Sequence, residues 1–151
     1  MSTKQKNSVI TTLLNGTLSS LKSVVPMDLE IMKPQLLEKN FRFNYGVFIG
    51  ITGDIRGKLI LASEPATFSS IGTVMFGMPL EGEMLHSFSG ELGNMVAGGL
   101  STNIFKNNIN INITAPTIMN GDTTLSGYKE ALKIPTKLES GNEMKVFLLM
   151  D

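Results

Sequence analysis

A short stretch near the middle of the chain places a carboxylate and an amide among glycines and apolar residues. In "SFSGELGNMVAGG", residues 87–99, Ser87, Glu91, Asn94 and Gly98 follow one another at intervals of four, three and four. On a helix these intervals bring the four residues onto one stripe of the surface. The carboxylate accepts hydrogen bonds, the amide both donates and accepts them, and the glycine leaves the stripe open. We therefore expect this stripe to be pressed against another molecule.

A long helix is the element that must position this stripe. Glu81 and Glu83 precede a helical pattern that continues to about Phe105, and Lys106 with the two following asparagines suits its carboxyl end. Residues 90–99 include four glycines, each of which costs about 0.5 to 1 kcal/mol relative to alanine, so we expect a second helix of the fold or a partner to approach closely. The apolar residues within one broad arc are expected to form the buried side: Met84, Leu85, Phe88, Leu92, Met95 and Val96.

Periodicity along the rest of the chain predicts further helices and strands. Spacings of three and four indicate helices, alternation indicates strands, and Ser63 before an acid and a proline indicates an N-cap. The stretch "NNININIT" alternates isoleucine with asparagine, and Pro116 is expected at or just past the middle of this strand. The predicted elements are a helix at 7–25 closed by Pro26, an extended or loop segment at 28–39, a strand at 41–51 paired with "KLILA" in an antiparallel hairpin, a helix at 64–76, the long helix, the "NNININIT" strand, and strands at 131–138 and 143–150 joined by a turn at "SGN".

The order of these elements predicts the fold class. Hairpins at both ends of the chain with two consecutive helices between them indicate an α+β fold, a largely antiparallel sheet covered by helices. The last strand, "EMKVFLLM", is apolar on both faces, so we expect it to be central in the sheet or paired with another subunit. With 151 residues and 42% apolar content, residues 1–151 are assigned to a single domain.

Composition narrows the classes of function and the location. Thirteen Lys and Arg balance thirteen Asp and Glu without a basic cluster, so nucleic acid is not an expected partner. The absence of cysteine removes thiolate chemistry and agrees with a reducing compartment, so a cytoplasmic location is expected. No apolar run approaches the roughly 20 residues that span a bilayer, and the interrupted N-terminal run is unlike a signal peptide. We expect a soluble protein without membrane insertion.

Conventional hydrolase and metal sites find little support. His86 is the only histidine, and Ser87 beside it points to another side of the helix, which disfavours a Ser-His pair. The sequence also excludes zinc sites built from His or Cys and lacks a phosphate-binding loop. A second Glu-x-x-Asn, from Glu139 to Asn142, falls in a predicted turn and is interpreted as a chance match. The ten methionines are expected to fill gaps in the core, including Met75, Met78, Met84 and Met95.

Together with "ITAPTIMNG", the opening stretch resembles the signature of the CheC, CheX and FliY phosphatases of bacterial chemotaxis. In that signature an acidic or serine residue, a glutamate four later and an asparagine three after that precede a proline. Here these residues are Ser87, Glu91, Asn94 and Pro116, and the specific resemblance covers roughly residues 83–122. CheC-type members carry two such motifs, whereas this chain has one on a helix and is in this respect similar to CheX. That similarity implies a homodimer whose sheets join.

The resemblance also implies an activity, the hydrolysis of the aspartyl phosphate on the phosphorylated response regulator CheY. It implies catalytic roles for Asn94, which would orient the attacking water, and for Glu91, which would dock the regulator. Ser87 and Gly98 would belong to the contact with the partner, and Pro116 would shape the strand end beneath the helix. The protein would need no cofactor or metal site of its own, because the regulator supplies the Mg²⁺.

A noncatalytic binding module of chemotaxis or of the flagellar switch is the main alternative. FliM has a related fold but lacks the active pair, so the fold alone does not establish phosphatase activity. The presence of both Glu91 and Asn94 favours the enzyme. A small-molecule sensor of similar fold is a third alternative, and it would require a preformed apolar pocket.

Overall fold

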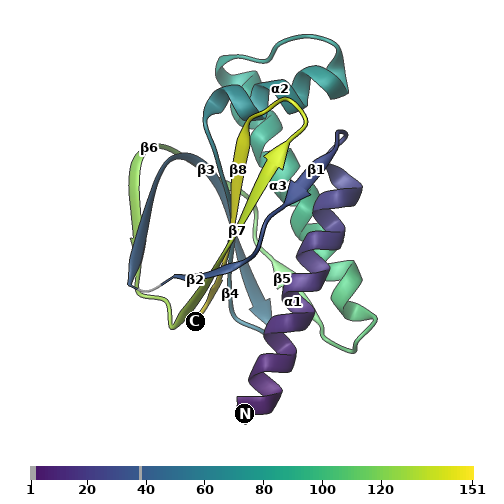
Figure 1. Ribbon diagram of the computed structural model, residues 1–151, viewed down its shortest axis with the longest axis vertical. Coiled ribbons are helices and arrows are strands. Elements are labelled where there is room, and N and C mark those ends of the chain that lie inside the picture. Colours follow the sequence, from purple (N-terminus) through teal and green to yellow (C-terminus); the bar gives the residue numbers. More distant parts are fainter. Residues whose placement is uncertain (1–2, 38) are drawn as a thin grey trace.

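Three helices and eight strands make up the part of the chain that the structure describes. The computed structural model describes residues 3–37 and 39–151. The helices are α1 (Thr3–Val24), α2 (Pro65–Phe76) and α3 (Gly82–Phe105). The strands are β1 (Leu29–Ile31), β2 (Gln35–Leu37), β3 (Asn40–Gly53), β4 (Gly57–Ala62), β5 (Ile111–Ile113), β6 (Thr117–Ser126), β7 (Glu130–Leu138) and β8 (Glu143–Met150) (Figure 1).

The strands form one antiparallel sheet. Its order is β1-β7-β8-β4-β3-β5, with β2 also paired to β7 and β6 also paired to β3. Every pairing is antiparallel, which confirms the predicted α+β class. The predicted hairpin is β3 with β4, and β8 lies between β7 and β4, so the prediction of a central last strand is also confirmed.

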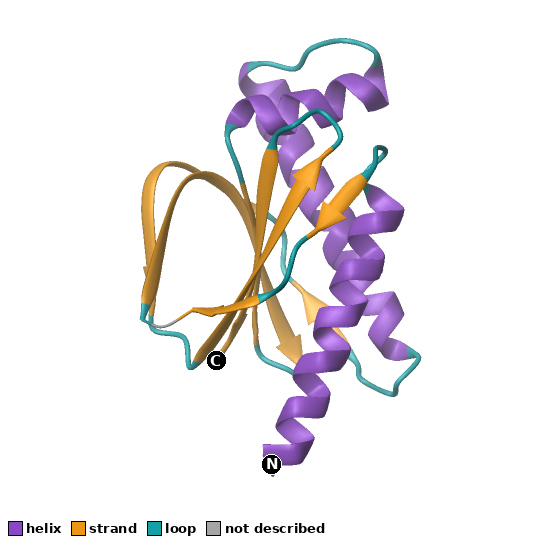
Figure 2. Ribbon diagram, in the orientation of Figure 1, coloured by secondary structure: helices purple, strands orange, loops and turns teal. Residues whose placement is uncertain are grey.

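The helices α1 and α3 lie side by side on one face of the sheet, and α2 lies at the end where α3 begins (Figure 2). Alternate residues of β3 point into the core beneath these helices, among them Tyr45, Val47 and Ile49, and α3 contributes Leu92 and Val96. This buried layer fixes α3 to the centre of the sheet. In the described residues no helix is long and apolar enough to cross a membrane.

A second apolar cluster lies on the opposite face of the sheet, away from α1 and α3. On β8, Val146 and Leu148 belong to the core beneath the helices, whereas Phe147 and Leu149 belong to this second cluster. The ring of Phe41, on β3, stacks on that of Phe147 with their centroids 4.0 Å apart. The two clusters explain why the last strand is apolar on both faces.

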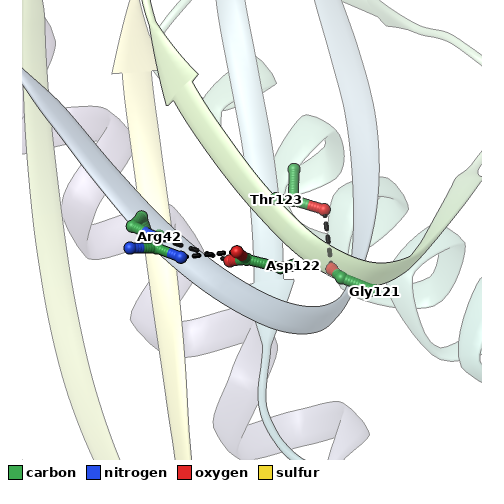
Figure 3. Close-up of polar contacts among 4 residues, drawn as sticks. All are labelled: Arg42, Gly121, Asp122 and Thr123. Atoms are coloured by element: carbon green, nitrogen blue, oxygen red, sulfur yellow. Dashed lines mark hydrogen bonds and ion pairs between the residues drawn. The ribbon is translucent and has the colours of Figure 1, made fainter.

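β6 is a separate strand that the sequence pattern does not predict. Residues 120–122, in the middle of this strand, are Asn, Gly and Asp, which are typical of turns. β6 nevertheless follows β3 through a bend, where the pairing register shifts between Phe43 and Tyr45. Beside the bend, Arg42 of β3 forms an exposed ion pair with Asp122 of β6, Nη2 to Oδ2, at 2.5 Å (Figure 3). An irregular strand of this kind has no clear alternation, so periodicity does not find it.

The predicted N-cap at Ser63 is wrong. The helix α2 begins at Pro65, and its N-cap residue is Glu64, which makes no side-chain capping bond. The Ser63 hydroxyl instead donates to the Glu143 carbonyl at 2.5 Å. It therefore joins the end of β4 to the start of β8 and is not available to the helix.

The predicted place of Pro116 within a strand is also wrong. β5 ends at Ile113, and the backbone N–H of Thr114 donates to the Gly50 carbonyl at 3.0 Å. Pro116 then lies in the connection from β5 to β6. The segment 28–39, predicted to be extended or loop, contains the short strands β1 and β2 on either side of a proline, while residue 38 lies outside the described residues.

Glycines allow α3 to approach both the sheet and α1. A Cβ added at Gly93 would lie 2.6 Å from Cγ1 of Val47 on β3, and one added at Gly99 would lie 2.2 Å from Oγ of Ser20 on α1. Real Cβ atoms do not come that close to other atoms. The close approach predicted from these glycines is therefore made by the protein's own elements.

We expect Gly93→Ala to lower the free energy of unfolding by about 1 to 3 kcal/mol, because the new methyl group overpacks the contact with Val47. The matched control is Gly98→Ala on the same helix, where an added Cβ meets nothing within 4 Å. That variant should gain about 0.4 to 1 kcal/mol from reduced chain entropy in the unfolded state. Urea unfolding of both variants measures the difference, and equal stabilities would contradict the packing argument.

Candidate functional site

Ser87, Glu91, Asn94 and Gly98 lie along one side of α3, and we call these four residues the polar strip. Ser87 and Glu91 are exposed, while Asn94 and Gly98 are partly exposed. The helix runs without interruption through all four positions. The structure therefore brings the predicted residues together on one accessible surface, and no side chain lies over Gly98.

The fold itself does not use the side chains of Glu91 and Asn94. No hydrogen bond or ion pair joins the Glu91 carboxylate or the Asn94 amide to any residue that the structure describes. Another amide of the same helix behaves differently, since Asn103 donates from Nδ2 to the Gly16 carbonyl of α1 at 3.0 Å. The two polar groups of the strip are thus available to a partner.

Contacts on the buried side hold α3 in one rotation about its axis. Ser20 of α1 donates from Oγ to the Val96 carbonyl at 2.7 Å, which joins the two helices beside the close contact at Gly99. On the sheet side, a Cβ at Gly90 would lie 3.5 Å from Cγ of Pro116. Pro116 therefore supports the turn of helix that immediately precedes Glu91, and it lies beneath the helix.

A buried hydroxyl pair lies beneath the same part of α3. The Tyr45 hydroxyl donates to Ser89 Oγ at 2.8 Å, and Ser89 Oγ donates to the Leu85 carbonyl at 2.8 Å. Burial raises the pKa of the Tyr45 phenol above its usual value of 10.0, and the hydrogen bond with Ser89 lowers it in part. The His86 ring stacks on the Tyr45 ring with centroids 5.9 Å apart, whereas the neighbouring Ser87 is exposed. No hydrogen bond joins His86 to Ser87 in the described chain, so they do not form a catalytic pair.

The structure also shows a feature of the site that the sequence analysis missed. Phe76, Met78 and Met84 are 62%, 48% and 57% exposed, and we call these three residues the apolar corner. They lie where α2 leads into α3 and line a groove of about 620 Å³ whose other walls include Ser87 and Glu91. An apolar surface is therefore continuous with the polar strip.

The apolar corner corrects two predictions about methionine. Met84 is not on the buried side of α3, and Met75, Met78 and Met84 do not fill the core; Met75 is 38% exposed, while Met95 is partly buried. The broad arc chosen for the buried side extends past the edge that the sheet and α1 cover. The spacing gave a usable signal, because Met84 precedes Ser87 by three residues and so shares the side of the helix that carries the strip.

The second Glu-x-x-Asn, from Glu139 to Asn142, lies in a turn between two strands. Glu139 is exposed and Asn142 donates from Nδ2 to Thr67 Oγ1 at 3.2 Å, both in the connection between β7 and β8, so the prediction of a turn there is confirmed. These two residues do not share a helix surface. Among the residues that the structure describes, no group of three or more His, Cys, Asp or Glu could hold a metal ion.

The chain matches a known protein family and a curated relative. Residues 45–137 match a family described as "Chemotaxis phosphatase CheX". A curated relative from Thermotoga maritima, named "CheY-P phosphatase CheX", is 27% identical over 145 residues, covering 93% of this chain and 94% of the relative.

Several solved structures share the fold, among them two CheX proteins. The chemotaxis protein CheX of Desulfovibrio desulfuricans has a TM-score of 0.79 at 17% identity, with 95% of this chain and 99% of that chain covered. The CheX-CheY-BeF3-Mg²⁺ complex of Borrelia burgdorferi has a chain with a TM-score of 0.75 at 21% identity, with 93% and 96% covered. At these identities the likeness shows the fold.

We expect Tyr45→Phe to lower the free energy of unfolding by about 1 kcal/mol at pH 7, because the buried hydroxyl pair loses its donor. The raised pKa sets the pH dependence: the contribution of the phenol is complete below the unfolded-state pKa of about 10 and decreases as the pH rises toward the folded-state pKa. The stability difference between wild type and Tyr45→Phe should therefore shrink above about pH 10. Urea unfolding at several pH values tests this, and a constant difference would contradict it.

Proposed function

Because this chain belongs to the chemotaxis phosphatase CheX family, we propose that it hydrolyses the aspartyl phosphate of a phosphorylated CheY-type response regulator. The observation that carries the proposal is the polar strip, in which Glu91 and Asn94 lie one turn apart on the solvent-facing side of α3 and have no bonding partner among the described residues. The relative from Thermotoga maritima, whose name states this activity, spans nearly the same length.

The reaction requires an oriented water more than a strong base. The water oxygen attacks phosphorus, the bond from phosphorus to the aspartate oxygen breaks, and inorganic phosphate and a free carboxylate result. An acyl phosphate is already reactive and its transition state is loose, so positioning and electrostatics supply most of the catalysis. The Asn94 carbonyl accepts a hydrogen bond from the water, and its NH₂ group donates to a phosphoryl oxygen. The amide does this without changing its protonation state.

Glu91 sets the position from which Asn94 acts. On a helix, residues three apart are neighbours with Cβ atoms about 5 to 6 Å apart, so a partner that binds one side chain must meet the other. The Glu91 carboxylate accepts charge-assisted hydrogen bonds from a lysine or from backbone N–H groups beside the phosphorylated aspartate. Its role is docking, and it fixes how deeply the amide enters.

The other residues of the signature shape the approach. Ser87 adds a hydrogen-bonding hydroxyl at the edge of the contact, and Gly98 leaves room for the partner because nothing lies above it. Pro116 lies beneath the helix at Gly90, so its role is to support the helix. The Mg²⁺ of the reaction belongs to the regulator, and this protein acts in the cytoplasm, where two-component response regulators operate.

We also propose that the protein is a homodimer in which sheets join across subunits. β6 is ten residues long, and its only partner among the described strands is β3, so its outer edge offers backbone groups for pairing. The β1 and β2 segments at the other side of the sheet are only three residues each. A joined sheet would cover the longer of these edges.

We predict that Asn94→Ala lowers the rate of dephosphorylation on the order of 10²-fold, about 3 kcal/mol, because the water loses its positioned acceptor. Glu91→Ala should also abolish most acceleration, through loss of docking. The measurement is decay of the phosphorylated cognate regulator with Mg²⁺ present, at matched concentrations of each variant.

Matched controls come from residues of the same types elsewhere. Glu139→Ala removes the carboxylate of the second Glu-x-x-Asn, and Asn112→Ala removes an exposed amide on β5. Both controls should retain full activity. Undiminished turnover by Asn94→Ala would refute its assigned role, and binding of the regulator by wild type without faster decay would favour a noncatalytic module.

For the proposed homodimer, sedimentation equilibrium should give a mass of twice 16.4 kDa. Backbone amides of β6 should exchange with solvent more slowly at high protein concentration than after dilution, because pairing protects the outer edge of the strand. A mass of 16.4 kDa at all concentrations, or concentration-dependent protection confined to another element, would contradict joining through β6.

A further inference from the structure

We propose that the apolar corner is a second docking surface for the same phosphorylated response regulator. The regulator inserts an apolar segment, flanked by a basic side chain, into the groove that the corner lines. This inference rests on the proposed function and names a surface for partner affinity that is separate from the amide that positions water. The occupant is inferred from the continuity of the groove with the polar strip, from its charge and from its construction.

Continuity follows from the lining of the groove. Ser87 and Glu91 belong both to the polar strip and to the walls of the groove. Met84 precedes Asn94 by ten residues, which is about 15 Å along a helix. A compact domain with a radius of gyration of about 13 Å has an outer radius of about 17 Å, so a regulator centred on Asn94 is wide enough to extend over Met84. A regulator that presents its phosphoryl group to Asn94 is therefore large enough to contact the corner as well.

The charges of the groove select the chemistry of the segment. Its two charged lining residues in the described chain are Glu83 and Glu91, and the remaining walls are apolar except for Ser87. An apolar side chain gains free energy by leaving water in such a groove, and a neighbouring Lys or Arg compensates the two carboxylates. A second copy of this chain is disfavoured at this surface, because symmetric contact would bring the same carboxylates close to one another.

The groove is built and held open by the protein itself. Gly77, in the left-handed conformation with φ 75°, ends α2 and turns the chain toward Met78. The Ser69 hydroxyl donates to the Leu80 carbonyl at 3.1 Å and accepts from the Leu80 N–H at 3.4 Å. The Leu80 side chain fills the space above Gly72, where an added Cβ would lie 2.4 Å from Cδ1. These contacts fix the connection between α2 and α3.

The exposed side chains of the corner combine an aromatic ring that contacts the core with two flexible thioethers. The Phe76 ring packs edge-on against buried Phe88, with centroids 5.8 Å apart and an interplanar angle of 88°. Met78 and Met84 are also exposed, and the unbranched methionine side chain adapts its shape to different apolar surfaces. An exposed aromatic side chain beside adaptable methionines is a suitable arrangement for binding a segment of another protein.

The test compares Phe76→Ala and Met84→Ala with Phe105→Ala, a matched control at the other end of α3. Phe105 is 64% exposed and Phe76 is 62% exposed, so the two Phe→Ala changes remove similar exposed rings. The probe is the cognate CheY-type regulator phosphorylated with acetyl phosphate, and for binding the same regulator activated with beryllofluoride and Mg²⁺. We expect Phe76→Ala to raise KM and Kd roughly tenfold and Met84→Ala about threefold, with kcat within about twofold of wild type. Phe105→Ala should match wild type in all three.

Several outcomes separate this inference from the proposed function. Unchanged KM and Kd in both Phe76→Ala and Met84→Ala, or an equal increase in Phe105→Ala, would overturn the docking surface while leaving the phosphatase intact. Binding by wild type without turnover, weakened by Phe76→Ala, would support the surface and refute the catalytic proposal. A shift of the sedimentation mass by Phe76→Ala alone would assign the corner to contact between copies and overturn the inference.

The charge of the groove has its own measurement. Glu83→Gln should raise the Kd about two- to threefold at low salt, and the difference should disappear at about 0.5 M salt, because ions screen an exposed attraction. Tighter binding by Glu83→Gln would overturn the basic character assigned to the docked segment. Met84→Ala serves as the comparison here, since loss of apolar contact should persist at high salt.

Discussion

The missing side chains of two glycines on α3 determine how the rest of the site is arranged. At Gly93 the helix backbone approaches Val47 of β3, and at Gly99 it approaches Ser20 of α1, more closely than any residue with a Cβ would allow. These two contacts lie on different sides of the helix and together prevent it from rotating about its axis. The orientation fixed in this way makes the polar strip face outward. The orientation of Glu91 and Asn94 is therefore set by residues that a partner does not touch.

The buried polar groups beneath α3 serve the same constraint. Each forms a hydrogen bond with a neighbour, since Ser20 donates to the Val96 carbonyl and Tyr45 donates to Ser89. These bonds fix the orientation of α3 and leave neither hydroxyl unpaired. In contrast, the polar groups that face solvent on the strip have no partner within the described chain. The helix thus separates polar groups that specify its own position from polar groups that remain available to another molecule.

Sequence reasoning succeeds here where one periodic pattern decides the structure. Alternation along β3 and the helical spacing of the polar strip are strong because every second residue, or every third and fourth, meets one environment. Prediction from the sequence fails where contacts between distant segments determine the local structure. The turn-like residues 120–122 lie inside β6 because β3 pairs with Asn120 and Thr123 on either side of the register shift, and Ser63 does not cap the helix because its hydroxyl bonds to Glu143. Met84 lies at the edge between the buried arc and the polar strip, so its spacing fits both sides, and its exposure depends on where the sheet and α1 stop covering α3.

Under the proposed function, rate and partner choice depend on different residues of one rigid helix. An amide that orients water does not titrate and recognises a phosphoryl group that all response regulators share, so Asn94 contributes little to choosing among them. Discrimination then requires contacts that differ between partners, and the apolar corner provides them about 15 Å away along the helix. Because the connection between α2 and α3 is held by Ser69 and Leu80, substitutions at exposed corner positions alter binding without moving the strip. The fold therefore allows partner preference to change while the catalytic geometry is preserved.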